Sequence, residues 1–390
     1  MVKTYRIGLF AERARAYGRR LCEGVAAFAM ETESWALESV EDMDLRRPSA
    51  LARYDGFIAR ILDDRIAAAF AATGKPVVDV FFNACRPGFA VVDQNPVAIA
   101  QLAARHFITR RFKNFAFCGY DGILFSDARR TAFVHCLELN HFGCAVYQTP
   151  RAALRDFGTM VVRRERLGAA PDERPLADWV RALPKPVAVL CSHDLRAYHL
   201  LRICRNVGIV VPRQVAILGV DDDPLVCGFT HPPLSSIDPD AFAVGHAAAE
   251  VLQRMLVDET VRAHPPVLRV KPKGLTVRSS SEIYPLDPPW LSDALVFIRC
   301  NVARRLTASD VFAHLGRSHT LVDAAFRSVI GRTVQQEIAR SRLEEARRLV
   351  GSSSLPLAEI AARCGFASSQ YFSRSYAAAF GAPPSRHARR

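Results

Sequence analysis

Residues 355–376 read LPLAEIAARCGFASSQYFSRSY, and this stretch predicts two short helices joined by a tight turn. Apolar residues recur at helical spacing in its first half. Gly365 suits the left-handed conformation that ends a helix, and Ser368 can cap the next helix by accepting a hydrogen bond from an N–H of its first turn. In that second helix Phe372 and Tyr376, four residues apart, are expected to face inward. The stretch therefore predicts a helix-turn-helix.

The outer face of the second helix is polar. A helix that presents such side chains can read base edges in the major groove of DNA. Pairs of helices of this shape are also common as plain packing units, so the stretch alone leaves that alternative open. If the helix reads DNA, the candidate residues are Ser369, Gln370, Ser373 and Arg374.

The same plan occurs upstream, in residues 306–331, LTASDVFAHLGRSHTLVDAAFRSVIG. Thr307 with Asp310 three residues later resembles a capping box at a helix start. Gly316 is placed to end that helix, and Ser318 to cap the next one. This stretch predicts a second helix-turn-helix.

An amphipathic helix is predicted between the two copies, over residues 333–350, and would hold two readers at a fixed separation. Because the plan occurs twice, DNA reading is favoured over plain helix packing. The candidate DNA-binding residues of the first copy are Ser318, His319, Thr320, Asp323 and Arg327.

The region from about residue 291 to residue 390 resembles the DNA-binding domain of AraC/XylS-family transcription regulators. The phrase IAARCGFASSQYFSRSYAAAFGAPPS, residues 360–385, matches that family's signature nearly throughout. The first copy departs from it, because Asp323 and Ala324 stand where family members usually carry long polar or basic side chains. Phosphate repels a carboxylate, which can at best accept from a cytosine amino group. The resemblance therefore implies sequence-specific binding to double-stranded DNA, with the second copy better equipped to read bases.

The charge distribution agrees with a polyanionic partner. The chain carries a formal net charge of +13. Residues 289–390 hold 15 arginines against 7 acidic residues, hence +8, while the remaining 288 residues contribute only +5. Basicity is thus concentrated where the helix-turn-helix pattern lies, which favours DNA binding over a merely solvated basic surface.

Ten cysteines are scattered singly, without a Cys-x-x-Cys pair, which is typical of free thiols in a reducing compartment. No uncharged apolar run approaches the roughly 18 residues of a membrane span. The start of the sequence reaches charged residues too soon for a secretory signal. We therefore expect a cytoplasmic protein with no membrane partner.

Residues 4–275 alternate short β-rich runs with helical stretches, which predicts parallel sheets with helices on both faces. About 270 residues exceed one compact unit, so two lobes are expected, roughly 1–110 plus 240–275, and 111–239. A linker would cover 276–290. The expected fold class is a two-lobed α/β sensor followed by an all-α domain with two helix-turn-helix motifs. No glycine-rich phosphate loop follows the first strand, so a nucleotide site has no support and no cofactor is expected.

The sensor region resembles the sugar-binding domain of LacI/GalR-type repressors, which is itself similar to periplasmic sugar-binding proteins. The resemblance rests on GVDDD at 219–223, PPLSSI at 232–237 and SDARRTAFVHCL at 126–137, in which Ala132 replaces the family's glycine. A sensor of this kind ahead of an AraC-type reader is similar to the XylR-type, xylose-responsive regulators, as is RAYGRRLCEGV at 15–25. Gly18 stands where those regulators have an aspartate, so another sugar is an open alternative.

The predicted sugar site lies where strands end, because ligands of open α/β sheets bind outside the carboxyl ends of the strands. Carboxylates accept from sugar hydroxyls, arginine donates in a planar fork, and an aromatic ring covers the apolar face of the sugar. Helix capping, an inter-lobe salt bridge and an ordinary loop histidine are the structural alternatives for these positions. The candidate ligand-binding residues are Tyr17, Arg19, Arg129, His193, Asp221 and Asp222.

Together these features predict a sugar-responsive regulator, with xylose or a related monosaccharide as effector and activation as the expected sign. We expect a homodimer that also engages RNA polymerase and performs no catalysis. One alternative is an enzyme on a regulator scaffold, such as a DNA-repair alkyltransferase with an acceptor cysteine; only Cys22, Cys85 and Cys300 have charged neighbours, without a Pro-Cys-His pattern. Another is a sugar-binding module of transport, which the basic C-terminal region disfavours.

Overall fold

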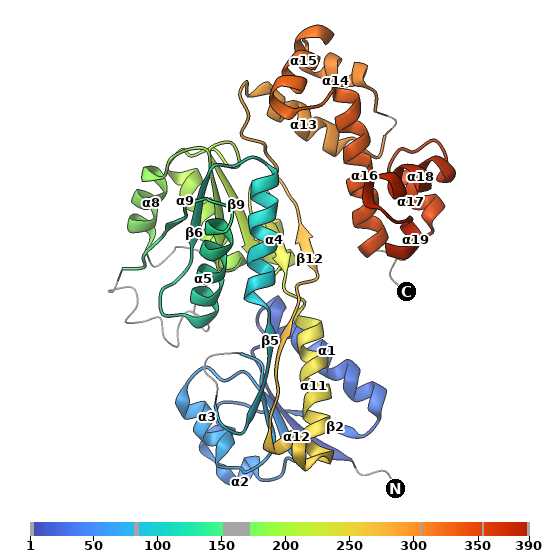
Figure 1. Cartoon of the computed structure of the whole chain (residues 1–390). Helices are drawn as coiled ribbons and strands as arrows, with labels where there is room; N and C mark the ends of the chain where they lie inside the picture. The colour runs from blue at the N-terminus through green and yellow to red at the C-terminus, as the bar shows by residue number, and fades with distance from the viewer. Residues whose placement is uncertain (1–3, 82–85, 151–171, 305, 353–354, 388–390) are drawn as a thin grey trace. The chain divides into compact units, whose positions relative to one another are not determined.

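The computed structural model of the chain describes residues 4–81, 86–150, 172–304, 306–352 and 355–387. The chain forms two compact units, Met1–Glu282 and Ile283–Arg390 (Figure 1). The first unit has two lobes, each built on a six-stranded sheet, and the second unit is helical, which confirms the predicted fold class. The finer bounds, with a linker over 276–290, stay a prediction. Within the described ranges no helix is both long and apolar enough to cross a bilayer.

The first lobe is organised around a sheet of order β11-β5-β4-β3-β1-β2, in which all neighbours run parallel. Its strands are β1 (Tyr5–Phe10), β2 (Trp35–Ser39), β3 (Gly56–Ala59), β4 (Val77–Asp79), β5 (Phe89–Gln94) and β11 (Val267–Val270). The helical elements are α1 (Ala16–Thr32), η1 (Asp44–Arg46), α2 (Pro48–Leu51), α3 (Asp64–Ala71), α11 (Ala241–Val257) and α12 (Glu259–Ala263). β11 returns to this lobe from late in the unit.

Alternate strand residues serve the two faces of this sheet, as the pleat requires. Ile58 packs with α1 and α11 on one face, while Phe57 packs with α2 and α3 on the other. α1 and α11 touch backbone to backbone: a Cβ on Gly24 would lie 2.0 Å from the carbonyl oxygen of Phe242, and one on Gly245 would lie 2.0 Å from that of Leu21. Glycine at both positions is therefore required by the helix contact.

The second lobe has a sheet of order β12-β10-β9-β8-β6-β7. Its strands are β6 (Asn114–Cys118), β7 (Ala145–Val146), β8 (Val187–Cys191), β9 (Val215–Val220), β10 (Ser235–Asp238) and β12 (Gly274–Thr276). α8 (Glu173–Ala182) and α9 (Asp194–Asn206) pack on one face, α4 (Pro96–Thr109) and α5 (Leu124–Glu138) lie together on the other (Figure 1), and α10 (Pro224–Phe229) follows β9.

One strand of this sheet departs from the predicted parallel arrangement. β12 runs antiparallel to β10, with Ile237 opposite Leu275. The chain reaches β12 from β11 after only three residues, without a crossover helix. β12 begins at Gly274, opposite Asp238, the last residue of β10, so the short link enters the second sheet at the carboxyl ends of its strands and runs backwards.

Within the described residues, the chain passes between the lobes three times: from β5 to α4, from β10 to α11, and from β11 to β12. α4 begins directly after β5, where Asn95 caps it by accepting from the N–H of Ala98. Near its other end, His106 Nε2 lies 2.8 Å from Ser281 Oγ, and that hydroxyl donates to Ser235 Oγ at 2.8 Å. The helix thus ties the first crossing to the last residues of the unit.

The second unit contains two helix-turn-helix motifs joined by one long helix. Its elements are α13 (Trp290–Cys300), α14 (Ala308–Leu315), α15 (His319–Ala325), the π-helical η2 (Phe326–Ile330), α16 (Val334–Ser352), α17 (Leu357–Arg363), α18 (Ser369–Phe380) and α19 (Pro384–His387). Each motif has its own core, one around Val322 and Phe326, the other around Phe372 and Tyr376. The predicted inward residues are therefore buried.

The predicted helix signals also hold. Thr307 and Asp310 form a reciprocal capping box at α14, and Gly316 ends that helix in the left-handed region, at φ 59°. Ser318 and Ser368 each accept from the third following N–H, at 3.4 and 3.2 Å. These local contacts fix where both reading helices begin.

Candidate functional site

Four of the six predicted ligand residues gather at one small cavity between the lobes of the first unit. Tyr17, Arg129, His193 and Asp221 line it, and its volume is about 40 Å³. Each side chain follows the carboxyl end of a strand or opens the helix after one. The parallel strands therefore bring to one place residues that lie about two hundred positions apart in the sequence.

Arg129 is buried and joins the two lobes. From α5 its guanidinium donates to the carbonyl oxygen of Ser192, which follows β8, and to Oε1 of Gln94, the last residue of β5 in the first lobe. It also lies 3.8 Å from Asp221 Oδ1 and 5.4 Å from the ring centre of Phe125. A buried fork of donors in this position is suited to hold a ligand oxygen.

Asp221 directly follows β9 and has a positive φ of 123°. Such a backbone conformation is costly for a residue other than glycine, and strain of this kind tends to mark functional positions. Burial raises the pKa of this carboxyl, while the nearby Arg129, His193 and Arg15 oppose the rise. The carboxylate is thus a desolvated acceptor facing several cations.

The first lobe contributes its own charged residues to the cavity. Arg60, which follows β3, forms an ion pair with Glu12 at 3.2 Å and lies over the ring of Phe81 at 4.6 Å. Burial lowers the pKa of Arg60. Tyr17 donates to Asp93 Oδ1 at 3.4 Å, and burial raises the pKa of the Tyr17 phenol well above its usual value, with the Asp93 carboxylate adding to the rise.

The other two predicted ligand residues lie outside the cavity lining. Arg19 is exposed on α1 and donates to the carbonyl oxygens of Arg13 and Ala14. Asp222 forms an ion pair with Arg278 at 2.8 Å and accepts from the hydroxyl of Thr276. Neither side chain is brought to the cavity, because one points from the outer side of its helix and the other faces β12.

A buried aspartate supports the cavity from behind. Asp194 Oδ2 accepts from the N–H of Asp223 at 2.8 Å, and its Oδ1 accepts from the hydroxyl of Ser236 at 2.5 Å. Burial raises the pKa of Asp194 to about 8, helped by Asp221 and Asp222. This residue braces the β9 end that presents Asp221.

Six further residues line the cavity that the sequence reading did not select. Two of them carry a usable signal: Arg60 directly follows an apolar strand, and Phe125 lies four residues before Arg129, on the same face of α5. The others lie in loops or at strand ends whose neighbours only the topology reveals. The six are Glu12, Arg15, Arg60, Phe81, Gln94 and Phe125.

The second helix-turn-helix presents its predicted readers to solvent. Ser369, Gln370 and Arg374 are exposed and Ser373 is half-buried, and Gln370 and Arg374 lie on the side of α18 away from Phe372. The same geometry lets polar side chains reach base edges when such a helix enters a major groove.

The first motif presents four of its five candidates. Ser318, His319, Thr320 and Arg327 are exposed, but Asp323 has a structural partner. Its Oδ1 accepts from the N–H of Val334 at 3.2 Å, at the start of α16, and its Oδ2 lies 3.6 Å from His319 Nε2. A carboxylate at this position therefore caps the following helix.

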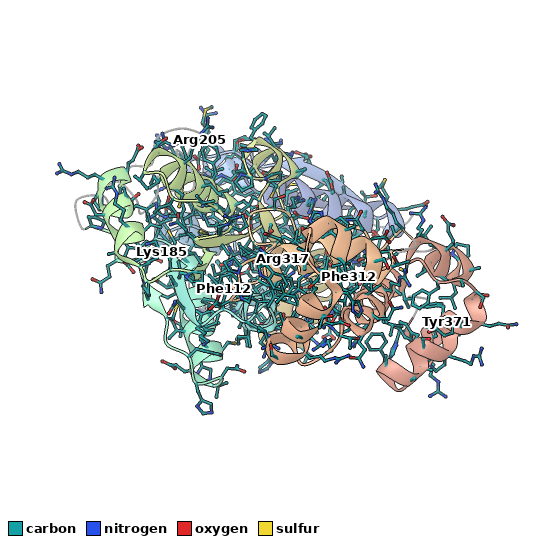
Figure 2. The ribbon with its side chains drawn as sticks, turned by 90° about the horizontal axis from the view of Figure 1, so that it is seen from above. Phe112, Lys185, Arg205, Phe312, Arg317 and Tyr371 are labelled. Carbon is teal, nitrogen blue, oxygen red and sulfur yellow. The ribbon has the colours of Figure 1, made fainter. Side chains whose placement is uncertain are left out.

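Two exposed apolar residues were missed on the reading helices. Leu321 on α15 and Tyr371 on α18 each follow their capping serine by three residues and are 49% and 57% exposed. Tyr371 projects from the second motif (Figure 2). In the first motif the guanidinium of Arg317 lies over the ring of Trp290, 5.1 Å from its centre. The recurrence of an exposed apolar side chain at one register position could have been read from the sequence repeat.

Comparison with known protein families divides the chain in the same way. Residues 104–281 match a periplasmic binding protein-like domain, and residues 312–390 match a helix-turn-helix domain. Over nearly its whole length the chain is similar to curated regulators of one kind. It is 27% identical to the xylose operon regulatory protein of Escherichia coli K12, covering 99% of this chain and 97% of that protein.

The chain is similar to XylR-type transcription regulators over nearly its whole length. The xylose operon regulatory protein of Haemophilus influenzae is 26% identical, with 94% of each chain covered. A solved structure described as the xylose-binding transcription activator xylR superposes with a TM-score of 0.60 at 26% identity, covering 99% of this chain and 98% of that one. The XylR-type order, sensor first and AraC-type reader second, is the predicted order.

Proposed function

We propose that this chain binds operator DNA through its second unit and responds to a monosaccharide, D-xylose or a relative, bound in its first. The observation that carries the proposal is the hydrogen bond from Arg129 to Gln94 at the cavity, which joins groups of both lobes at one point. The relatives that match over nearly the full length regulate a xylose operon, and one is described as xylose-binding.

In this proposal the sugar acts by closing the lobes. A ligand shifts such an equilibrium only if it binds the closed state better than the open one. Tyr17, Arg129, His193 and Asp221 supply that preference, because they reach the cavity from both lobes. The cavity volume of about 40 Å³ has room for only a few water molecules, because one water needs roughly 10–15 Å³ by this measure. Entry of a sugar therefore requires the lobes to part or side chains to move.

The DNA step assigns the contacts with DNA to the exposed residues of α15 and α18. α16, with 19 residues, is roughly 28 Å long at 1.5 Å per residue, comparable with the roughly 34 Å between successive major grooves. The second motif reads bases through Gln370 and Arg374. Ser318, His319, Thr320 and Arg327 of the first contact phosphate or sugar and fix the register. Ser369 and Ser373 complete the second motif.

The remaining parts of the proposal concern assembly and place. The chain works as a homodimer in the cytoplasm, recruits RNA polymerase as an activator, and performs no catalysis. Residues 1–275 bind the sugar, 276–290 link, and 291–390 bind DNA. Among the three cysteines considered for an acceptor role, Cys300 is exposed and Cys22 is half-buried, with its pKa raised by burial, while Cys85 lies outside the described residues. A raised pKa disfavours the thiolate that an acceptor would need.

The test is a gel-shift titration of the full chain on its own promoter region, with and without D-xylose and related monosaccharides. We expect binding in the nanomolar range that changes at least tenfold with one sugar. Binding should also weaken steeply with salt, because each neutralised phosphate adds about −0.9 to the log–log slope. The absence of DNA affinity under every condition would overturn the proposal.

A further inference from the structure

The cavity between the lobes is lined by more positive than negative charge. Arg15, Arg60 and Arg129 face Glu12 and Asp221, which gives the lining a formal charge of +1 with His193 neutral. A neutral sugar offers hydroxyls, which need acceptors as much as donors. Arg60 pairs with Glu12, and Arg129 donates to Ser192 and Gln94. Because each guanidinium has five N–H donors and no acceptor, the three arginines still offer such a ligand more donors than acceptors.

The positive groups come from both lobes. Arg15 precedes α1 and Arg60 follows β3 in the first lobe, whereas Arg129 is on α5 and His193 follows β8 in the second. Cations brought together by lobe closure repel one another in a site from which water is displaced. An anion bound between these cations replaces their repulsion by attraction, so it would stabilise the closed state in particular.

The carboxylates behind the lining do not remove this excess. Asp93 lies 3.5 Å from Arg269 as well as accepting from Tyr17. Asp194 has a pKa of about 8 and Asp79 one of about 7, so near neutral pH both are largely or partly protonated. Gly18 cannot be replaced by an acidic residue, because a Cβ there would lie 1.6 Å from the carbonyl oxygen of Glu12.

We propose that the effector is a monosaccharide that carries a carboxylate, an aldonic or uronic acid, held by Arg15, Arg60 and Arg129. This inference rests on the proposed sugar-responsive function and narrows its ligand class. A carboxylate matches the planar fork of arginine with two parallel hydrogen bonds. A sugar phosphate shares the anionic chemistry, but it carries close to two negative charges at neutral pH, and the single excess positive charge of the lining matches the one charge of a carboxylate.

The experiment is a thermal-shift and calorimetric titration of the full chain with D-xylose, D-xylonate, D-glucuronate and D-xylose 5-phosphate. We expect one of the two sugar acids to bind at least tenfold more tightly than D-xylose, with an affinity that falls as salt rises. Equal or tighter binding of D-xylose overturns the inference and leaves the proposed function standing. Preference for the phosphate overturns the carboxylate assignment. If none of these sugars binds while DNA binding persists, the sugar sensor and this inference both fall.

Two matched arginine variants test how the anion is held. Arg15→Gln should lower the affinity ratio of sugar acid to D-xylose by about tenfold. Arg19→Gln, four residues later on the exposed side of α1, should leave the ratio unchanged. If Arg15→Gln weakens acid and neutral sugar equally, Arg15 acts on the shape of the loop and does not hold the carboxylate, which contradicts the assignment.

Discussion

The guanidinium of Arg129, in the second lobe, donates a hydrogen bond to the side-chain oxygen of Gln94, the last residue of β5 in the first lobe. The same guanidinium holds the Ser192 carbonyl oxygen and lies 3.8 Å from Asp221. The buried guanidinium of Arg129 therefore contacts both lobes and the end of β9. A ligand oxygen placed in the cavity would compete for these donors and so change the contact between the lobes.

Replacing Arg129 by lysine should weaken sugar binding by at least tenfold. Lysine keeps the charge but cannot donate to Gln94, Ser192 and a ligand at once in a planar fork. Isothermal titration with the preferred sugar is the measurement. Arg19→Lys is the control, because Arg19 donates to Arg13 and Ala14 outside the cavity. An equal loss of sugar affinity in both variants would show a general destabilisation of the protein and not the loss of a contact between Arg129 and the ligand.

Arg374→Ala should cost roughly 1–3 kcal/mol of operator affinity if the side chain reads a base bidentately, and should relax specificity at one position. Arg363→Ala is the matched control, since that arginine on α17 pairs with Glu359 at 2.7 Å. Both variants are measured by selection from a randomised operator. A uniform loss over all sequences would mean that Arg374 contacts phosphate.

Leu321 is expected to contact a thymine methyl group. Its exposed side chain lies on the reading helix, and apolar contact with that methyl distinguishes thymine in the major groove. Replacing the contacted thymine by uracil should cost the wild type about 0.8 kcal/mol, roughly fourfold. Leu321→Ala should be insensitive to the same replacement. An unchanged response in the variant would place the contact elsewhere, with Tyr371 as the next residue to test.

Asp323→Ala should destabilise the protein by roughly 1 kcal/mol, because the N–H of Val334 loses its acceptor. Asp323→Asn keeps an oxygen at the same place and should retain most of the stability. Neither change should alter base preference. The measurements are urea unfolding and operator selection; altered selectivity with unaltered stability would assign Asp323 to base reading after all.

Asp79 should make stability fall as pH rises. Burial raises its pKa to about 7, while its Oδ1 accepts from the N–H groups of Ile61 and Phe81. Since the folded state holds the proton more tightly than the unfolded one, the stabilisation is complete below about pH 4 and is lost as pH rises through 7. It amounts to no more than about 4 kcal/mol.

Asp79→Asn stays neutral and keeps an oxygen for both N–H groups. The thermal midpoint of the variant should therefore drop less than that of the wild type between pH 5.5 and pH 8. An identical pH dependence in both proteins would show that Asp79 is ionised throughout this range.

Much of the fold could be predicted from the sequence where the pattern was strong. The apolar runs at 56–59 and 215–220 form β3 and β9, which are buried along their whole length, and a capping Asn95 followed by Pro96 starts α4. β2 was missed: Trp35–Ser39 is an edge strand whose residues are only partly buried. β12 has three residues, too few for any periodicity, and its direction depends on where the neighbouring lobe lies.

The residues of the candidate site were also predictable only in part. Arg129 and Asp221 follow from strand-end position and from the family pattern. Asp222 follows from the same rule, yet its side chain turns to Arg278, because adjacent residues at a strand end point to different sides. Glu12 and Phe81 enter the cavity from loops, and their position depends on the pairing of distant strands. Local pattern carries no information on that pairing.

α4 connects the cavity to the last residues of the first unit. Its cap residue, Asn95, follows Gln94 at the cavity, and its last turn holds Ser281 through His106. A helix bends little over its length, so a small rotation at the capped end swings the far end through a larger arc. The point at which the polypeptide leaves the sensor is fastened to that far end. A ligand that turned α4 would therefore also move Ser281, at the end of the first unit, where the connection to the DNA-binding unit begins.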